Sequence, residues 1–194
     1  VGSEMCIRDS SYSESDNAGI RTYLTFGGDK DSFGWAKGLK FTMNFGADYV
    51  SSDGTEMMNK YHGNQATSGG LLEKGHTRMM SYTFNQLLTW GRSFGSHSVD
   101  ALLGHEFYDR QYRSLGAGKQ NIVDGIDELD PAAILYAASS YSTEYAVESW
   151  FGRANYNYDD KYYFSASFRR DGSSRFYKDN RWGSFLSLIH ISEP

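Results

Sequence analysis

The stretch WFGRANYNYDDKYYFSASFR, residues 150–169, consists of two runs of alternating side chains joined by the pair Asp159 and Asp160. In each run, apolar or small residues occupy every second position and more polar residues occupy the positions between. Successive side chains of a β-strand point to opposite faces, so this alternation predicts two strands with one apolar and one polar face. Aspartate is frequent in tight turns. The stretch therefore predicts an antiparallel hairpin.

The same alternation extends outward from this hairpin over residues 41–49, 82–90 and 99–107, and more weakly over 21–26. Aromatic residues make up 16% of the chain, with 15 Tyr and 12 Phe, and such residues favour strands over helices. No run approaches the roughly 18 apolar residues of a membrane-spanning helix. The prediction is an all-β chain of about five or six antiparallel strands.

The connections between the expected strands alternate in length. Short turns are expected at residues 36–38, 91–96 and 159–160, whereas residues 50–77 and 109–144 are long and polar. Short turns on one side and long loops on the other are typical of outer-membrane barrels. Structureless loops of such length are uncommon in compact soluble domains. The pattern predicts part of a transmembrane antiparallel β-barrel, an open curved sheet.

The chemistry of the two faces agrees with a membrane-spanning sheet. Expected strands of about ten residues match what a tilted strand needs to cross hydrocarbon. An arginine facing lipid at mid-depth costs about 2–4 kcal/mol, so charged residues of the polar face are expected to line a wet lumen. The residues expected in the lumen are Asp48, Glu106, Arg153 and Arg169.

The sequence contains no motif that predicts catalysis, a cofactor or a metal site. His62, His76, His97 and His105 lack metal-ligand spacing, and no nucleophile, Walker or dinucleotide signature is present. The carboxylates between residues 124 and 130 predict a solvated acidic loop, with a calcium site as the alternative. The net charge of -5 argues against a nucleic-acid partner.

The two ends of the chain do not fit the sequence beside them. Residues 1–10 read VGSEMCIRDS and residues 186–194 read LSLIHISEP. A DNA sequence that encodes the first segment has a reverse complement that encodes the second. We interpret both segments as products of a sequencing adaptor and not as parts of the natural fold. The natural segment is expected to be residues 11–185.

Several segments resemble the SusC/RagA family of TonB-dependent outer-membrane transporters from Bacteroidetes. They are the run NYNYDDKYYFSASFRRDGSSRF at residues 155–176, NRWG at 180–183, KGLK at 37–40 and LLGHEFYD at 102–109. The resemblance implies a barrel of about 22 strands with an N-terminal plug, of which this chain is a mid-barrel piece. It also implies a SusD-like surface lipoprotein, the TonB complex and outer-membrane lipid as partners.

The function that follows is import of oligosaccharides, or of peptides, through the outer membrane, without any enzymatic step. Four tyrosines expected in the long loops, Tyr61, Tyr112, Tyr136 and Tyr141, are candidates for contact with substrate or lipoprotein. Ordinary loop packing is their alternative role. Two other functions are retained: an enzyme embedded in an outer-membrane barrel, and a soluble β-sandwich that binds carbohydrate.

Overall fold

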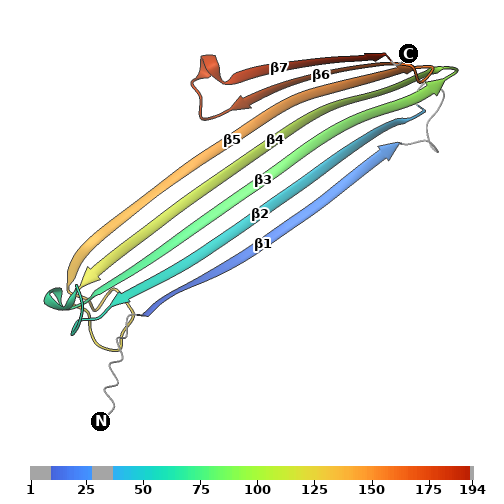
Figure 1. The fold of residues 1–194 in the computed structure, drawn as a ribbon. Helices are drawn as coiled ribbons and strands as arrows, with labels where there is room; N and C mark the ends of the chain where they lie inside the picture. The colour runs from blue at the N-terminus through green and yellow to red at the C-terminus, as the bar shows by residue number, and fades with distance from the viewer. Residues whose placement is uncertain (1–9, 28–36, 193–194) are drawn as a thin grey trace, which may run out of the picture. The chain divides into compact units, whose positions relative to one another are not determined.

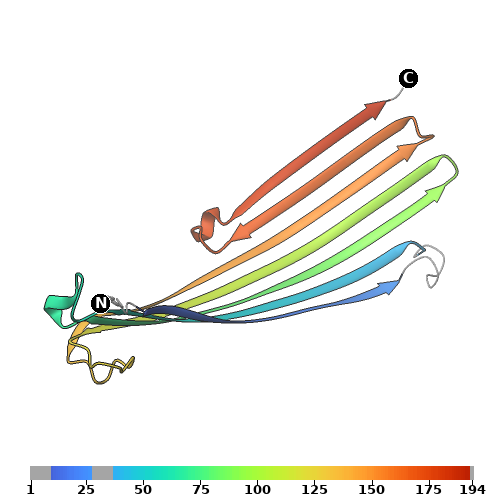
Figure 2. The same ribbon diagram turned by 60° about the horizontal axis from the view of Figure 1, so that its bottom comes forward.

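The computed structural model describes residues 10–27 and 37–192, which form a single antiparallel sheet (Figure 1). Neighbouring strands follow chain order from β1 to β7, as Figure 2 also shows. In the described residues, no helix is long and apolar enough to cross a membrane. The strands are β1 (Ser10–Gly27), β2 (Leu39–Met58), β3 (Leu71–Phe94), β4 (His97–Gln120), β5 (Ile134–Tyr158), β6 (Tyr162–Ser173) and β7 (Trp182–Ser192), with two short 3-10 turns, η2 (Ala66–Ser68) and η3 (Lys178–Asn180).

The chain divides into two compact units. The first unit comprises Val1–Ala18, Asp48–Met80 and Gln111–Thr143, and it contains the connections 59–70 and 121–133. The second comprises Gly19–Ala47, Ser81–Arg110 and Glu144–Pro194, and it contains the tight turns after β3 and β5. An all-β antiparallel sheet is thus confirmed.

The hairpin at residues 150–169 forms as expected. Asp159 and Asp160 both adopt positive φ, 54° and 53°, and the Lys161 amide donates to the Tyr158 carbonyl at 3.0 Å. Two adjacent residues with positive φ match the twist of the strands they join. The expected link 91–96 is shorter than predicted, because β3 continues to Phe94 and leaves only Gly95 and Ser96.

The turn expected at residues 36–38 is described only from Lys37, and Ala36 lies outside the described residues. Gly38 has φ 85°, and its carbonyl accepts a hydrogen bond from the Gly91 amide at 3.3 Å. A Cβ atom on Gly38 would lie 2.1 Å from the Gly91 carbonyl oxygen. Both the positive φ and this close approach of two backbones require glycine.

The register of β5 and β6 separates two faces. Directly opposed residues of an antiparallel pair point to the same side of the sheet. One face carries the pairs Gly152/Phe168, Ala154/Ala166, Tyr156/Phe164 and Tyr158/Tyr162, and the other carries Ser149/Asp171, Phe151/Arg169, Arg153/Ser167 and Asn155/Ser165. We call these the apolar face and the polar face. The alternation expected from the sequence is therefore present in the paired strands.

The expectation of loops at residues 50–77 and 109–144 is wrong over most of their length. Strands β2 and β4 continue to Met58 and Gln120, while β3 and β5 begin at Leu71 and Ile134. In these outer portions many residues on both faces are polar or small, so hydrophobic alternation is absent although backbone pairing persists. Residues 59–70 connect β2 to β3, and residues 121–133 connect β4 to β5.

A small hydrophobic cluster lies in the first unit. Leu72 is fully buried, and Ile122 and Ala132 pack with it, with Met57 and Leu129 at its margin. The two connections also share backbone hydrogen bonds: the Asn121 amide donates to the Ser68 carbonyl at 3.0 Å, and the Ile122 amide to the Gly69 carbonyl at 3.0 Å. The connections 59–70 and 121–133 therefore form one packed structure.

The segment expected to be adaptor-derived contributes most of β7. Leu186 to Ser192 pair with β6 in regular register. Phe185, Ile189 and Ile191 lie opposite Arg169, Ser165 and Tyr163 respectively, so these apolar side chains share the polar face. In β6, Phe164 and Phe168 lie on the apolar face, which also carries Arg170 opposite Trp150.

We predict that Leu72→Ala destabilises the packed connections by about 2–5 kcal/mol, because it leaves a cavity where the side chain is fully buried. Amide hydrogen exchange of residues 59–70 and 121–133 measures this effect. Leu135→Ala, at a side chain that is 64% exposed in the same unit, is the matched control. Equal exchange in the two variants would contradict the proposed packing.

Candidate functional site

The polar face of the second unit holds a network centred on Arg169. Its Nε donates to both carboxylate oxygens of Asp171, at 2.8 and 2.9 Å, and its Nη2 donates to the Ser149 hydroxyl at 3.3 Å. The guanidinium also lies 5.6 Å from the ring centroid of Phe151. Glu106 of β4 is close enough to attract Arg169 electrostatically. The structure thus brings together two of the residues expected in the lumen.

Arg153 lies in a second polar group on the same face. It lines a hollow of about 260 Å³ together with Asp100 and Asn155. The Asn155 side-chain oxygen accepts a hydrogen bond from the Ser165 hydroxyl at 2.8 Å. Asp48 lies in β2 and belongs to the first unit, whereas the other three expected lumen residues belong to the second.

Three of the four candidate tyrosines lie in strands, which corrects their expected location in loops. Tyr112 is in β4, and Tyr136 and Tyr141 are in β5. The rings of Tyr112 and Tyr141 pack at a centroid distance of 5.9 Å. Their placement follows from the extension of β4 and β5 by cross-strand pairing, which the polar composition of residues 109–144 conceals.

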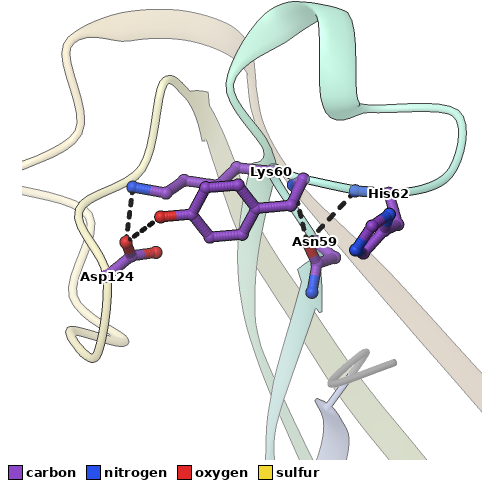
Figure 3. A network of polar contacts seen from close by, with 5 residues as sticks. Asn59, Lys60, His62 and Asp124 are labelled. Carbon is purple, nitrogen blue, oxygen red and sulfur yellow. Dashed lines mark hydrogen bonds and ion pairs between the residues drawn. The ribbon is translucent and has the colours of Figure 1, made fainter. Parts of the chain in front are cut away.

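Tyr61 lies in the connection 59–70 and forms a link to the connection 121–133 (Figure 3). Its hydroxyl donates to Asp124, and the Nζ of Lys60 lies 2.7 Å from the same carboxylate oxygen. The Asn59 side-chain oxygen accepts from the backbone amides of Tyr61 and His62, at 2.6 and 3.3 Å. We call Lys60, Tyr61 and Asp124 the loop link.

The loop link shifts the ionisation of its members. The hydrogen bond from Lys60, followed by that from Tyr61, holds the pKa of Asp124 below its ordinary value of 3.8. The hydrogen bond to Asp124 raises the pKa of Lys60 above 10.5. Both pKa shifts favour the ionised forms, so Asp124 and Lys60 are both charged at pH values between 3.8 and 10.5.

Three carboxylates of the connection 121–133 engage different parts of the first unit. Asp124 binds Lys60 and Tyr61, Asp127 accepts from the Tyr12 hydroxyl at 3.1 Å, and Glu128 lies 3.1 Å from the Nζ of Lys74. In residues 10–27 and 37–192, no cluster of three acidic, His or Cys residues has the arrangement of a metal site.

A hollow lined by small residues was not anticipated from the sequence. It has a volume of about 540 Å³ in the first unit, and its lining includes Gly54, Gly75, Gly116, Gly118, Ala137 and Ser139. Charged side chains at its margin are Glu56, Glu73 and Lys74. The sequence predicts a loop over residues 109–144, whereas Gly116, Ala117 and Gly118 lie in β4 and line this hollow.

The sequence is similar to known proteins over 77% of the chain. No family model matches the chain. TonB-dependent receptor P3 of Formosa agariphila is 34% identical over 157 residues, and TonB-dependent receptor SusC of Bacteroides thetaiotaomicron is 29% identical over 152 residues. Each alignment covers 77% of this chain and 15% of the relative, so the chain spans a small part of those proteins.

A solved structure shares the fold. The RagAB peptide transporter superimposes with a TM-score of 0.82 and 25% identity, over 93% of this chain and 20% of that chain. The structure of the RagAB peptide importer in its open-open state gives a TM-score of 0.81 over the same shares. The long, consecutively paired strands therefore correspond to part of a larger transporter chain.

We predict that the loop link weakens in acid. The pKa of Asp124 is lowered in the folded state, so its stabilising contribution is complete above pH of about 3.8 and is lost as the pH falls through the folded-state pKa. Amide exchange of residues 121–133, corrected for intrinsic rates, should rise over that range. Asp124→Asn should raise exchange at neutral pH and remove the acid dependence, whereas an unchanged acid response in this variant would refute the assignment.

Proposed function

Because the chain belongs to the SusC/RagA family of TonB-dependent receptors, we propose that its sheet forms part of the wall of an outer-membrane β-barrel that imports nutrients. The relatives are named as receptors and transporters, and none is named as an enzyme. The barrel wall has a passive role in this proposal: it separates lipid from a wet lumen and carries no reacting group.

The separation of the two faces in β5 and β6 is the observation that supports the proposal. Phe164, Ala166 and Phe168 share one side with Gly152 and Ala154, a surface fit for hydrocarbon. The side with Arg153 and Arg169 is unsuited to lipid, because a guanidinium at mid-membrane costs about 2–4 kcal/mol. In a closed barrel the polar face lines the lumen, and the apolar face contacts the membrane.

The lumen residues have separate roles in this proposal. Arg153, with Asp100 beside it, and Arg169, with Asp171 and Glu106, present fixed charges of both signs along the wall. Asp48 adds a further carboxylate on β2. Alternating charges hydrate the lumen and give polar substrates or a plug domain hydrogen-bonding partners.

The cargo is an oligosaccharide or a peptide, and a SusD-like lipoprotein is the surface partner. This part of the proposal rests on the relatives named SusC and RagAB, the latter described as a peptide transporter. Tyr61 and the connections 59–70 and 121–133 offer a preorganised surface for such a partner, because the loop link holds them in one arrangement. Energy comes from the TonB complex through regions outside this chain.

Cysteine labelling tests the sidedness directly. In the full-length receptor, expressed in a Bacteroidetes host, Ser165→Cys should react with a membrane-impermeant maleimide after the outer membrane is opened. Phe164→Cys, its neighbour on the other face, should react only with a lipid-soluble reagent. The receptor should also fractionate with the outer membrane. The reverse labelling pattern, or a soluble receptor, would refute the barrel.

We also propose that residues 1–10 and 186–194 derive from adaptor DNA and that residues 11–185 are the natural segment. The support for this boundary is that DNA encoding one end segment is the reverse complement of DNA encoding the other. Long-read sequencing of the parent gene should give a different sequence from residue 186 onward. A parent gene that encodes LSLIHISEP there would overturn the proposal.

A further inference from the structure

A hollow of about 560 Å³ in the first unit combines positive charge with hydroxyl groups. Strands β3, β4 and β5 line it, and its lining includes His76, Arg78, Arg113, Leu115, Ser140 and Ser142. No acidic residue belongs to its lining. Arginine presents a planar set of donors that matches the oxygens of phosphate and carboxylate groups. The charge and donor groups of this hollow therefore favour an anionic ligand.

Both arginines of this hollow are available for a ligand. Arg78 and Arg113 are exposed, and neither forms an ion pair or hydrogen bond among residues 10–27 and 37–192. The acidic side chain bound to the hollow's histidine is Asp53, whose carboxylate lies 2.8 Å from His76 Nδ1. Two cationic side chains that line one hollow repel each other, so an anion between them gains attraction from both.

Strand alternation determines which face this hollow occupies. Arg78 lies two and four residues before Met80 and Tyr82 in β3, so the three side chains share a face. Arg113 is six residues beyond Phe107 in β4 and shares its face in the same way. Tyr82 and Phe107 pack against each other at 5.8 Å. The arginines thus belong to the aromatic face and not to the face expected in the lumen.

The position along the strand agrees with the level of lipid headgroups. Aromatic residues such as Tyr82 mark the boundary between hydrocarbon and water in membrane barrels. Arg78 precedes Tyr82 by four residues in β3. Basic side chains just outside this boundary attract anionic headgroups.

We propose that this hollow binds the anionic phosphate headgroup of a membrane lipid. Arg78 and Arg113 donate charge-assisted hydrogen bonds to the phosphate, and the hydroxyls of Ser140 and Ser142 complete its coordination. Leu115, which is 59% exposed, contacts the apolar base of the headgroup. The proposal rests on the membrane location proposed above, and it adds a lipid-binding site to the outer wall of the barrel.

Short-chain lipids test the site in the detergent-solubilised, delipidated full-length receptor. Calorimetric titration with dihexanoyl phosphatidic acid should show saturable binding. The double variant Arg78→Gln/Arg113→Gln should lose about tenfold or more in affinity, since two charge-assisted contacts are removed. Inorganic phosphate, titrated in parallel, should bind more weakly than the lipid, because it lacks the contact with Leu115.

Arg110→Gln is the matched control. Arg110 is exposed, lies three residues from Arg113 on the same strand, and points to the opposite face. This variant should keep the affinity for the lipid, and heat-dependent gel mobility confirms that every variant retains a folded barrel. Unchanged binding in the double variant overturns the site, and inorganic phosphate binding as tightly as the lipid overturns the lipid assignment.

The two proposals fail in different ways. A receptor absent from the outer-membrane fraction refutes the barrel and the lipid site together. A receptor that resides in the outer membrane, but whose affinity for phosphatidic acid does not depend on Arg78 and Arg113, refutes only the lipid site.

Discussion

The structure depends on one constraint: each strand must satisfy its backbone hydrogen bonds through its neighbours while its two faces carry side chains of different polarity. Peptide groups in hydrocarbon have no water to bind, so pairing between strands is obligatory there. The pairing also sets the register, and a slip of one residue would exchange the faces. In β5 and β6 such a slip would bring Arg169 to the side of Gly152 and Ala154. The two-residue turn at Asp159 and Asp160 prevents it, because its φ angles fit one register.

The sequence predicts the fold best where the two faces differ most. Between residues 150 and 169, bulky apolar and polar side chains alternate, and the observed register agrees with the expected faces. Residues 109–120 lack that contrast, since Gly116, Ala117 and Gly118 carry little side-chain information about either face. Cross-strand hydrogen bonds keep such residues extended, and no local pattern reports on those bonds. The extensions of these strands therefore cannot be predicted from the side-chain pattern alone.

The contacts of the candidate site are likewise only partly predictable from the sequence. That Arg169 and Asp171 share a face follows from their spacing of two, but the Ser149 hydroxyl 20 residues earlier joins them only through the β5–β6 register. The loop link is harder still to predict from the sequence, because 63 residues separate Tyr61 from Asp124. Arg78 and Arg113 also converge from neighbouring strands without a motif that connects them. Alternation predicts the face of a residue, whereas long-range pairing determines its neighbours.

The shared hydrogen bonds of the two connections limit how these segments diverge among relatives. Residues 68–70 supply carbonyls to the amides of Asn121 and Ile122, so an insertion that displaces residues 68–70 leaves these amides without acceptors. Changes of length should then occur in matched pairs, and a loop grafted alone from a relative should fold poorly. Exchange of both connections together should therefore preserve these hydrogen bonds, whereas exchange of one alone should not.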